Sequence, residues 1–386
     1  MALRTAAALS EHPLATHAVG ECVGRLLDAG GEGPADLVVV FATEPVLGAL
    51  EDVTRAVREL LSPRVLVGAS AVSLLAGRRE VEEHAALAMF GLWLDGDAPA
   101  RPVPVRLEAL PRPDGPELVG LAALERATGT LVLLPDPFTC PVDRMLSELA
   151  AIAPDLAVVG GMASAARHPG GNRLVLDGQL HTGGAVGVLL PPSVPVRTVV
   201  SQGCRPIGSP LTVTRAERNM LLELAGRPAF ELLVDLVREL PPEEQQLATR
   251  GLHIGRVVDE YRAEFTRGDF LVRAVLGGDK EAGAVAVGDE IDVGATVQFH
   301  VRDAQSAHED LEQLMAGQRA DGALVFTCNG RGSRLFGVPD HDAEVVSEAL
   351  GDVPLAGMFC AGELGPVGRS NFVHGFSASV ALFGEQ

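Results

Sequence analysis

The segment Cys328-Asn-Gly-Arg-Gly332 directly follows an apolar stretch and combines a thiol, an amide and a guanidinium. Its two glycines permit positive φ angles and a close approach of the backbone to a ligand. Arg331 is suited to clamp a carboxylate with two parallel hydrogen bonds. The segment lacks the Gly-Lys-Ser/Thr ending of a P-loop, and acidic residues open the next predicted helix, where they would compete with phosphate. The pattern therefore favours a small carboxylate over a nucleotide.

A second glycine-rich stretch runs from Gly362 to Gly375 and supplies many donors and acceptors. Glu363 and Asn371 are suited to take an amine, and Arg369 is suited to hold a carboxylate. These groups would satisfy a ligand resembling an amino acid. The alternative is a self-satisfied polar loop in which Glu363 pairs with Arg369, with His374 as a structural hydrogen-bonding residue.

A third glycine-rich element, Gly203-Cys-Arg-Pro-Ile-Gly208, carries Cys204 and Arg205. Cys204 is interpreted first as a small buried hydrophobic residue rather than a nucleophile. Together the three elements give one set of candidate ligand-binding residues. The set is Cys328, Asn329, Gly330, Arg331, Gly332, Gly362, Glu363, Arg369, Asn371, His374, Cys204 and Arg205.

Cys328 is the best candidate for a reactive thiol, because Arg331 and Arg334 nearby would favour the thiolate. Paired with His374 it would satisfy the chemistry of a cysteine hydrolase, and alone it would suit a redox sensor. Other enzyme signatures are absent from the sequence: there is no Gly-x-Ser-x-Gly, no His-Glu-x-x-His and no early Gly-x-Gly-x-x-Gly. The run Glu82-Glu83-His84 is interpreted as a solvated turn. We therefore expect no enzyme, no cofactor and no metal site.

A repeated unit must position these residues. An apolar strand, a helix, a second strand ending in glycine, a polar loop and a third strand recur three times. The opening strands are predicted at 36–41, 129–134 and 322–327, the helices at 46–61, 142–152 and 343–350, the second strands at 64–68, 156–160 and 353–357, and the third strands at 85–94, 183–190 and 372–383.

The first two strands of each unit are continuous apolar runs, which is typical of strands covered on both faces. A right-handed strand–helix–strand crossover makes such strands parallel. Long loops of this kind are more often functional than decorative. We therefore expect the site at the sheet edges where the three glycine-ended strands release their loops.

The middle of the chain follows a different pattern. Short strands are predicted over 196–214, with a further strand over 219–224. Amphipathic helices are predicted over 229–239 and 303–319, and an antiparallel meander over 270–275, 284–287 and 295–302. The segment Pro191-Pro192-Ser193 suggests a boundary between domains 1–192 and 193–386, and a proline-rich surface segment is predicted over 98–116. The predicted fold class is mixed α+β (α/β), with two domains of mixed sheets covered by helices.

The composition and net charge of the chain disfavour some classes of binding partner. The 386 residues carry a formal net charge of -20, which disfavours nonspecific binding to nucleic acid or to an anionic membrane. No signal peptide is predicted, and no apolar run reaches the length of a membrane span. The five cysteines form no Cys-x-x-Cys pair, so reduced thiols in the cytoplasm are the simplest interpretation.

The carboxy-terminal motifs closely resemble those of FIST domain proteins. The resemblance is carried by the run from Gly322 to Gly332, by Pro354-Leu-Ala-Gly-Met-Phe-Cys-Ala-Gly-Glu-Leu-Gly-Pro366 and by Asn371-Phe-Val-His-Gly-Phe-Ser-Ala-Ser379. The stretch from Ser201 to Ala229 belongs with them. The first half, from Asp36 to Leu190, resembles the FIST amino-terminal part.

This resemblance implies a bacterial, intracellular sensory module for small ligands such as amino acids, of a kind often joined to signalling output domains. No output domain is visible in this sequence. The expected partners are a small-molecule ligand and a signalling protein, without nucleic acid or membrane. Two alternatives stay open at this point: a protein-interaction scaffold, and a thiol-based redox sensor or enzyme using Cys328.

Overall fold

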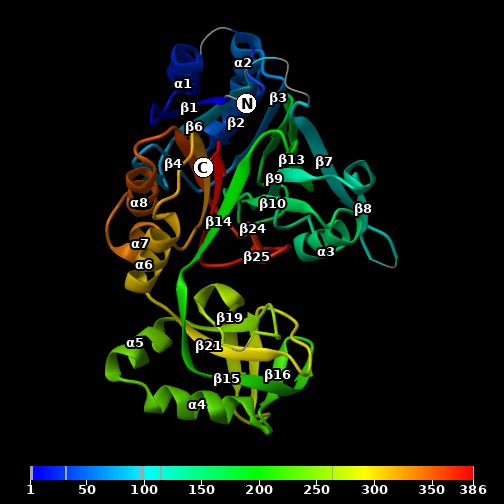
Figure 1. Ribbon diagram of the computed structural model, residues 1–386, viewed down its shortest axis with the longest axis vertical. Helices are drawn as coiled ribbons and strands as arrows, with labels where there is room; N and C mark the ends of the chain where they lie inside the picture. Colours follow the sequence, from blue (N-terminus) through cyan, green and yellow to red (C-terminus); the bar gives the residue numbers. More distant parts are fainter. Residues whose placement is uncertain are drawn as a thin grey trace. The chain divides into compact units, whose positions relative to one another are not determined.

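The computed structural model describes residues 3–30, 33–94, 96, 100–113, 115–262 and 264–385, and the chain divides into two compact units (Figure 1). The large unit comprises residues 1–200, 311–373 and 377–386, and the small unit comprises 201–310 and 374–376. These units follow spatial contacts, whereas the predicted domains 1–192 and 193–386 are two regions of sequence. The mixed α+β class and the two-domain organisation are confirmed.

The three predicted repeats form the large unit. The first repeat contains β2 (Leu37–Ala42), η1 (Val46–Ala49), α2 (Leu50–Leu61), β3 (Val65–Ser70), β4 (Ser73–Ala76), β5 (Arg79–Glu82) and β6 (Leu87–Leu94). The second contains β9 (Gly129–Pro135), α3 (Val142–Ile152), β10 (Leu156–Gly161), β11 (Leu174–Leu176), β12 (Gln179–His181) and β13 (Ala185–Leu190). The third contains β22 (Gly322–Cys328), α7 (Ser333–Phe336), α8 (His341–Leu350), β23 (Leu355–Cys360), β24 (Glu363–Val367), β25 (Ser370–His374) and β26 (Ser377–Phe383).

Each repeat builds the same sheet. The opening strand pairs in parallel with the second strand and antiparallel with the third, as in β2 with β3 and β6. The same pattern holds for β9 with β10 and β13, and for β22 with β23 and β26. These sheets also include β1 (Leu3–Ser10), β7 (Val103–Leu110), β8 (Glu117–Val119) and β14 (Val196–Gln202). The strand orders are β1-β6-β2-β3-β11-β12, β25-β24-β10-β9-β13-β7-β8 and β14-β26-β22-β23-β4-β5.

The repeats exchange hairpins in a ring. The hairpin β4–β5 of the first repeat extends the sheet of the third, beside β23. The hairpin β11–β12 of the second repeat extends the sheet of the first, beside β3, and β24 of the third pairs with β10 of the second. The segments predicted as loops therefore contain short strands. The predicted third strand over 372–383 is likewise two strands, β25 and β26.

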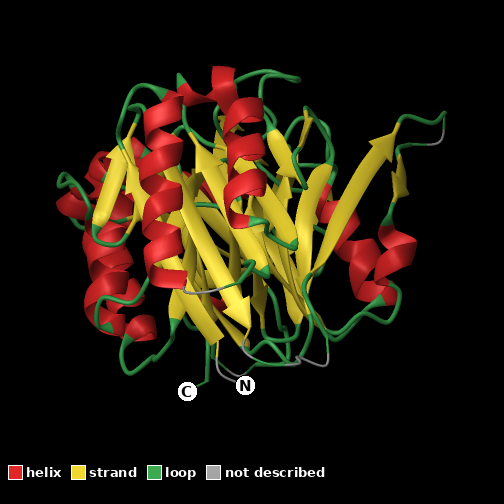
Figure 2. Cartoon of the chain, turned by 90° about the horizontal axis from the view of Figure 1, so that it is seen from above, coloured by secondary structure: helices red, strands yellow, loops and turns green. Residues whose placement is uncertain are grey.

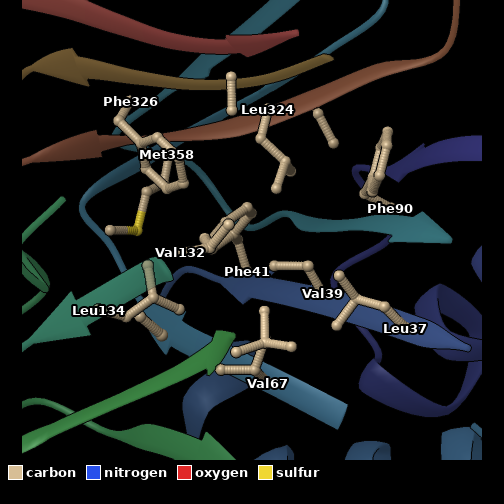
Figure 3. Packing of buried hydrophobic residues seen from close by; sticks show 14 of the residues in the cluster. Leu37, Val39, Phe41, Val67, Phe90, Val132, Leu134, Leu324, Phe326 and Met358 are labelled. Atoms are coloured by element: carbon tan, nitrogen blue, oxygen red, sulfur yellow. The ribbon is translucent and has the colours of Figure 1, made fainter. Parts of the chain in front are cut away.

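Alternate residues of the opening strands face a common core. Phe41, Val132, Leu134, Leu324 and Phe326 are fully buried members of one hydrophobic cluster at the centre of the three sheets (Figure 3). Their sequence neighbours face outward into separate clusters with the helices, so helices surround the strands (Figure 2). This two-sided burial explains the continuous apolar runs.

The glycine of each second strand has a steric cause. A Cβ atom at Gly68, Gly160 or Gly357 would lie 2.1, 2.0 or 1.9 Å from a backbone carbonyl oxygen of the opening strand. The opposing residues are Val40, Leu133 and Val325. The three repeats therefore cross at equivalent positions, which allows their residues to be aligned.

Further elements complete the large unit. These are β1 (Leu3–Ser10), α1 (Ala15–Gly30), β7 (Val103–Leu110), β8 (Glu117–Val119), η2 (Leu121–Leu124) and β14 (Val196–Gln202). The strand β7 runs through the proline-rich segment predicted over 98–116, of which residues 98, 99 and 114 lie outside the described residues. The helix predicted over 303–319 is α6 (Ala304–Met315).

The small unit is built on one antiparallel sheet that closes on itself, because its first strand pairs both with its last strand and with its second. Its elements are β15 (Cys204–Glu217), β16 (Met220–Leu224), β17 (Arg227–Pro228), α4 (Ala229–Glu239), α5 (Pro242–Arg250), β18 (Leu252–Val257), η3 (Arg267–Asp269), β19 (Phe270–Asp279), β20 (Ala284–Val287) and β21 (Thr296–Arg302). The prediction of a simple meander is wrong, because β18 lies between β19 and β21.

Candidate functional site

A cavity of about 500 Å³ lies in the large unit, at the carboxyl ends of the opening and second strands of all three repeats. Parallel strands that end at one sheet edge commonly place their following residues around a ligand. The lining residues are Thr43, Glu44, Ala71, Val72, Glu83, His84, Pro137, Phe138, Ser164, Ala165, Ala166, Arg167, Asn329, Arg334 and Ala361.

The repeats contribute equivalent positions to this pocket. Each opening strand has one residue opposite the glycine of its second strand. The residues four positions after these three are Glu44, Pro137 and Asn329. All three line the cavity. The three repeats thus place an acidic, an apolar and an amide side chain in the pocket lining from equivalent backbone positions.

Ser164 of the second repeat forms hydrogen bonds with both other repeats at the pocket. Its hydroxyl donates to the carbonyl of Phe359 at 2.5 Å and accepts from the backbone N–H of Val72 at 3.1 Å. Its own N–H donates to the carbonyl of Ser70. One buried side chain therefore links the second strands of all three repeats.

Charges of both signs stand at the rim. Arg334 forms an ion pair with Glu83, and the neighbouring Ser333 donates its N–H and hydroxyl to Glu82 at 2.8 and 2.7 Å. Glu44 and Arg167 are exposed lining residues. The rim can therefore meet a ligand that carries both charges.

Asn329 is the one residue of the predicted set that lines the pocket. Its N–H donates to the carbonyl of Cys360 at 2.9 Å, which fixes the backbone. Its side-chain Oδ1 is buried and has no hydrogen-bond partner. A buried amide in this state has hydrogen-bonding capacity to spare.

Arg331 is fully buried behind this wall. It donates from Nε and one terminal nitrogen to Asp342, at 2.7 and 2.9 Å, and its Nη1 has no partner. Thr327 donates to the same carboxylate at 2.5 Å. Burial alone would raise the pKa of Asp342, but the charge of Arg331 and hydrogen bonds from His341, Arg331 and Thr327 hold that pKa well below its usual range.

Glu363 is also fully buried. Its Oε2 accepts from the N–H and hydroxyl of Ser377, at 3.1 and 2.8 Å. Burial raises the pKa of Glu363 to about 8, against the lowering effects of Ser377, Arg331 and Cys328. Burial and the charge of Asp342 likewise raise the pKa of Glu80 to about 8. The wall is thus backed by two carboxyls that are largely protonated at neutral pH.

Other predicted residues have different surroundings. Arg369 is exposed and pairs with Asp155 at 2.9 Å, so the alternative that it pairs with Glu363 is wrong. Asn371 accepts from the N–H of Val158 and donates to the carbonyl of Leu156, both at 2.8 Å. Both side chains are engaged with the second repeat.

Three predicted residues belong to the small unit. Cys204 is buried in a hydrophobic cluster with Phe270, and Arg205 pairs with Glu244 at 2.9 Å and with Asp303 at 3.3 Å. His374 is buried. The structure does not bring these three to the pocket lining, whereas Gly330 and Gly332 flank Arg331 and Gly362 precedes Glu363 behind the pocket.

Sequence reasoning missed most of the lining. Glu83 and His84 lie in an exposed turn, as the sequence predicts, but nothing in the sequence marks that turn as part of a pocket. Glu44, Phe138 and Arg167 carry no motif. The repeat itself held the signal, because residues that directly follow equivalent strands converge. Within the described ranges there is no group of three or more His, Cys, Asp or Glu residues that could hold a metal.

Two family models match the chain. A FIST N domain matches residues 36–227 and a FIST C domain matches residues 229–366. An uncharacterized protein of Mycobacterium tuberculosis strain H37Rv is 40% identical over 387 residues, covering 99% of this chain and 100% of the relative. An uncharacterized protein of Mycobacterium bovis is 42% identical over 378 residues, covering 96% of each chain. None of the helices in the described ranges is long and apolar enough to cross a membrane.

Proposed function

The chain belongs to the FIST family, and on that premise we propose that its large unit senses a small dipolar metabolite, an amino acid or a similar carboxylate, in the pocket between the three repeats. FIST domains are sensory domains of signal-transduction proteins, and the family is not known as an enzyme family. A signalling protein as the partner stays a prediction.

The observation that carries the proposal is the convergence of equivalent strand ends on one cavity. Its volume of about 500 Å³ lies within the range of about 300–1,000 Å³ typical of small-molecule sites. Side chains directly after equivalent strands are free to differ while the scaffold stays the same. Such a pocket suits recognition rather than structural packing.

The lining matches a dipolar ligand. Arg334 and Arg167 supply positive charge, and Glu44 and Glu83 supply negative charge, so a carboxylate and an amine would each find a partner. Asn329 offers a hydrogen bond that the protein itself leaves unused. Ligand binding would replace the existing rim pair rather than bury an unpaired charge.

In this proposal Arg331 and Glu363 support the wall and do not touch the ligand. Arg331 spends two of its donor groups on Asp342, and Glu363 is held by Ser377. Cys204, Arg205 and His374 belong to the small unit and take no part in this proposed site.

Isothermal calorimetry and thermal-shift screens of the twenty amino acids and common di- and tricarboxylates test this function. For any ligand found, Asn329→Ala and Arg334→Ala should each weaken binding about 10-fold or more, because a hydrogen bond to a charged group contributes about 1.5–3 kcal/mol. Arg369→Ala is the control, since Arg369 is exposed and absent from the pocket lining. Equal affinity of all three variants and the native chain would remove the pocket from the proposal.

A further inference from the structure

Two cysteines lie side by side at the ends of neighbouring strands. Cys328 ends β22 and Cys360 ends β23, and the two are register partners in this parallel pair. Register partners project to the same face, and adjacent strands lie about 4.7–4.9 Å apart. That separation falls within the range of about 4.4–6.8 Å between the Cα atoms of disulfide-bonded cysteines.

The lack of a side chain at Gly161 makes room for Cys360 Sγ. Cys360 Sγ lies over Gly161, where a Cβ atom would be only 2.1 Å from it. Cys360 is fully buried, whereas Cys328 is partly exposed. An oxidant in solvent can therefore reach Cys328 first, with Cys360 placed behind it.

Glu363 is placed to take the thiol protons. The carboxyl has Ser377 on Oε2 and no N–H or O–H donor on Oε1. The Cys328 side chain is within hydrogen-bonding reach, and the charge of Glu363 also acts on Cys360. Arg331 is close enough for its charge to interact with Cys328, which favours a thiolate there.

Both cysteines adjoin the pocket. Asn329 follows Cys328 and Ala361 follows Cys360, and both of these residues line the cavity. The hydrogen bond from the Asn329 N–H to the Cys360 carbonyl joins the two strands at this point. A change in the spacing of the cysteines would therefore move two lining residues.

We propose that Cys328 and Cys360 form an oxidisable pair that a hydroperoxide converts to a disulfide, with Glu363 as the base. Cys328 attacks the peroxide, its sulfur is oxidised to a sulfenic acid, and the peroxide leaves as an alcohol, or as water from hydrogen peroxide. The Cys360 thiol then displaces water from the sulfenic acid and the S–S bond forms. Two thiols lose two hydrogens in all, and one hydroperoxide is reduced.

The protonation state of Glu363 sets how this base works. Burial raises the pKa of Glu363 to about 8, so a minor fraction of the carboxyl is ionised at neutral pH, and that fraction grows as pH rises. The ionised carboxylate is the form that accepts the Cys328 proton. A disulfide exchanges with an added thiol through a mixed disulfide, so the bond can be reduced again. Oxidation would thus reshape the pocket reversibly, a consequence that rests on the proposed function.

Hydrogen peroxide treatment of the full chain, followed by intact and peptide mass spectrometry, tests the chemistry without any ligand. The expected result is a loss of two hydrogens, a cross-link between the peptides of Cys328 and Cys360, and reversal by dithiothreitol. Cys328→Ser and Cys360→Ala should each abolish the link. Cys22 and Cys140 are internal controls, because burial raises the pKa of each to about 12 and they should react last.

Glu363→Gln tests the base. It should slow the link at least about 10-fold at pH 7 and shift the pH profile of its formation, which a purely structural role would not do. Oxidation of Cys328 to a sulfinic acid without a link, or faster oxidation of Cys22 or Cys140, would overturn the proposal. Since no ligand is involved, such a failure would leave the proposed sensory pocket untouched, and a failed ligand screen would leave the thiol pair untouched.

Discussion

The second and third repeats anchor the loops after their opening strands in different ways. In the second repeat the buried carboxylate of Asp136 accepts from neutral donors, Thr139 at 2.7 Å and Asn172 at 2.8 Å. In the third repeat the anchor is the buried ion pair of Arg331 with Asp342. The strands that lead into the two loops are equivalent, but hydrogen bonds from neutral donors hold one loop and a buried ion pair holds the other.

This difference decides how each loop responds to damage. Loss of a neutral donor leaves one polar group unsatisfied, whereas loss of one partner from a buried ion pair leaves an uncompensated charge. The loop of the third repeat, which carries Asn329, should therefore lose more stability when its anchor is removed than the loop of the second repeat.

The largest expected effect is that of Arg331→Ala. The substitution leaves the carboxylate of Asp342, whose side chain is 0% exposed, without its charged partner. It should lower the free energy of unfolding by about 3–5 kcal/mol, measured by urea denaturation. The double variant Arg331→Met, Asp342→Leu is the control and should recover most of the loss, because a buried pair can be replaced by apolar groups. A loss below about 1 kcal/mol in the single variant would break the comparison.

A smaller effect is expected for Asp136→Ala. It removes the acceptor of Thr139 and Asn172 and should cost about 1–3 kcal/mol, followed by the same denaturation. Asp136→Asn keeps an acceptor oxygen and should cost less. If Asp136→Ala proved as costly as Arg331→Ala, the distinction between neutral and charged anchors would be wrong.

The pH dependence of the unfolding free energy tests a buried carboxyl of the third repeat. The pKa of Glu363 is raised to about 8 in the folded state, so the native protein keeps a proton that the unfolded chain loses above about pH 4.5. Stability should therefore fall as pH rises toward 8, by about 1.4 kcal/mol per pH unit for one such group.

Glu363→Gln should remove this contribution and make the profile between pH 6 and 8 less steep in thermal unfolding, while the contribution of Glu80 remains. Glu125→Gln changes an exposed carboxyl and should leave the slope as it is. An unchanged slope in Glu363→Gln would show that this carboxyl does not hold the proton.

The smallest effect is expected for Arg369→Ala. The Arg369 side chain is 89% exposed and pairs with the exposed Asp155, and such pairs contribute about 0–1 kcal/mol. A change within about 0.5 kcal/mol in urea denaturation would agree with this. A loss comparable to that of Asp136→Ala would mean that the pair has a structural role.

The sequence predicts the repeats well because their signal is local. Continuous apolar strands and a glycine at each crossing can be recognised within short windows, and the crossings at Gly68, Gly160 and Gly357 have one steric cause. The hairpin exchange could not be foreseen in this way. Strands as short as β11 (Leu174–Leu176) have little pattern of their own, and their partners lie far away in the chain.

The site was harder to predict than the fold. Arg331 has the residue type of a carboxylate clamp, and the carboxylate it clamps belongs to the protein itself, at Asp342. Of the three glycine-rich elements, only the one from Cys328 to Gly332 contributes a predicted residue, Asn329, to the pocket lining. Lining residues such as Glu44 have no motif because position relative to the strand end, rather than residue type, brings them there.

The ring of exchanged hairpins also limits how this chain can be divided. Each second strand completes its sheet with a strand borrowed from the next repeat, at β3, β10 and β23. A fragment holding one repeat would expose an unpaired edge and carry a hairpin with nothing to join, a combination that invites aggregation. Three such fragments expressed together could still close the circle, so reassembly from pieces, rather than folding of any piece alone, is what this architecture permits.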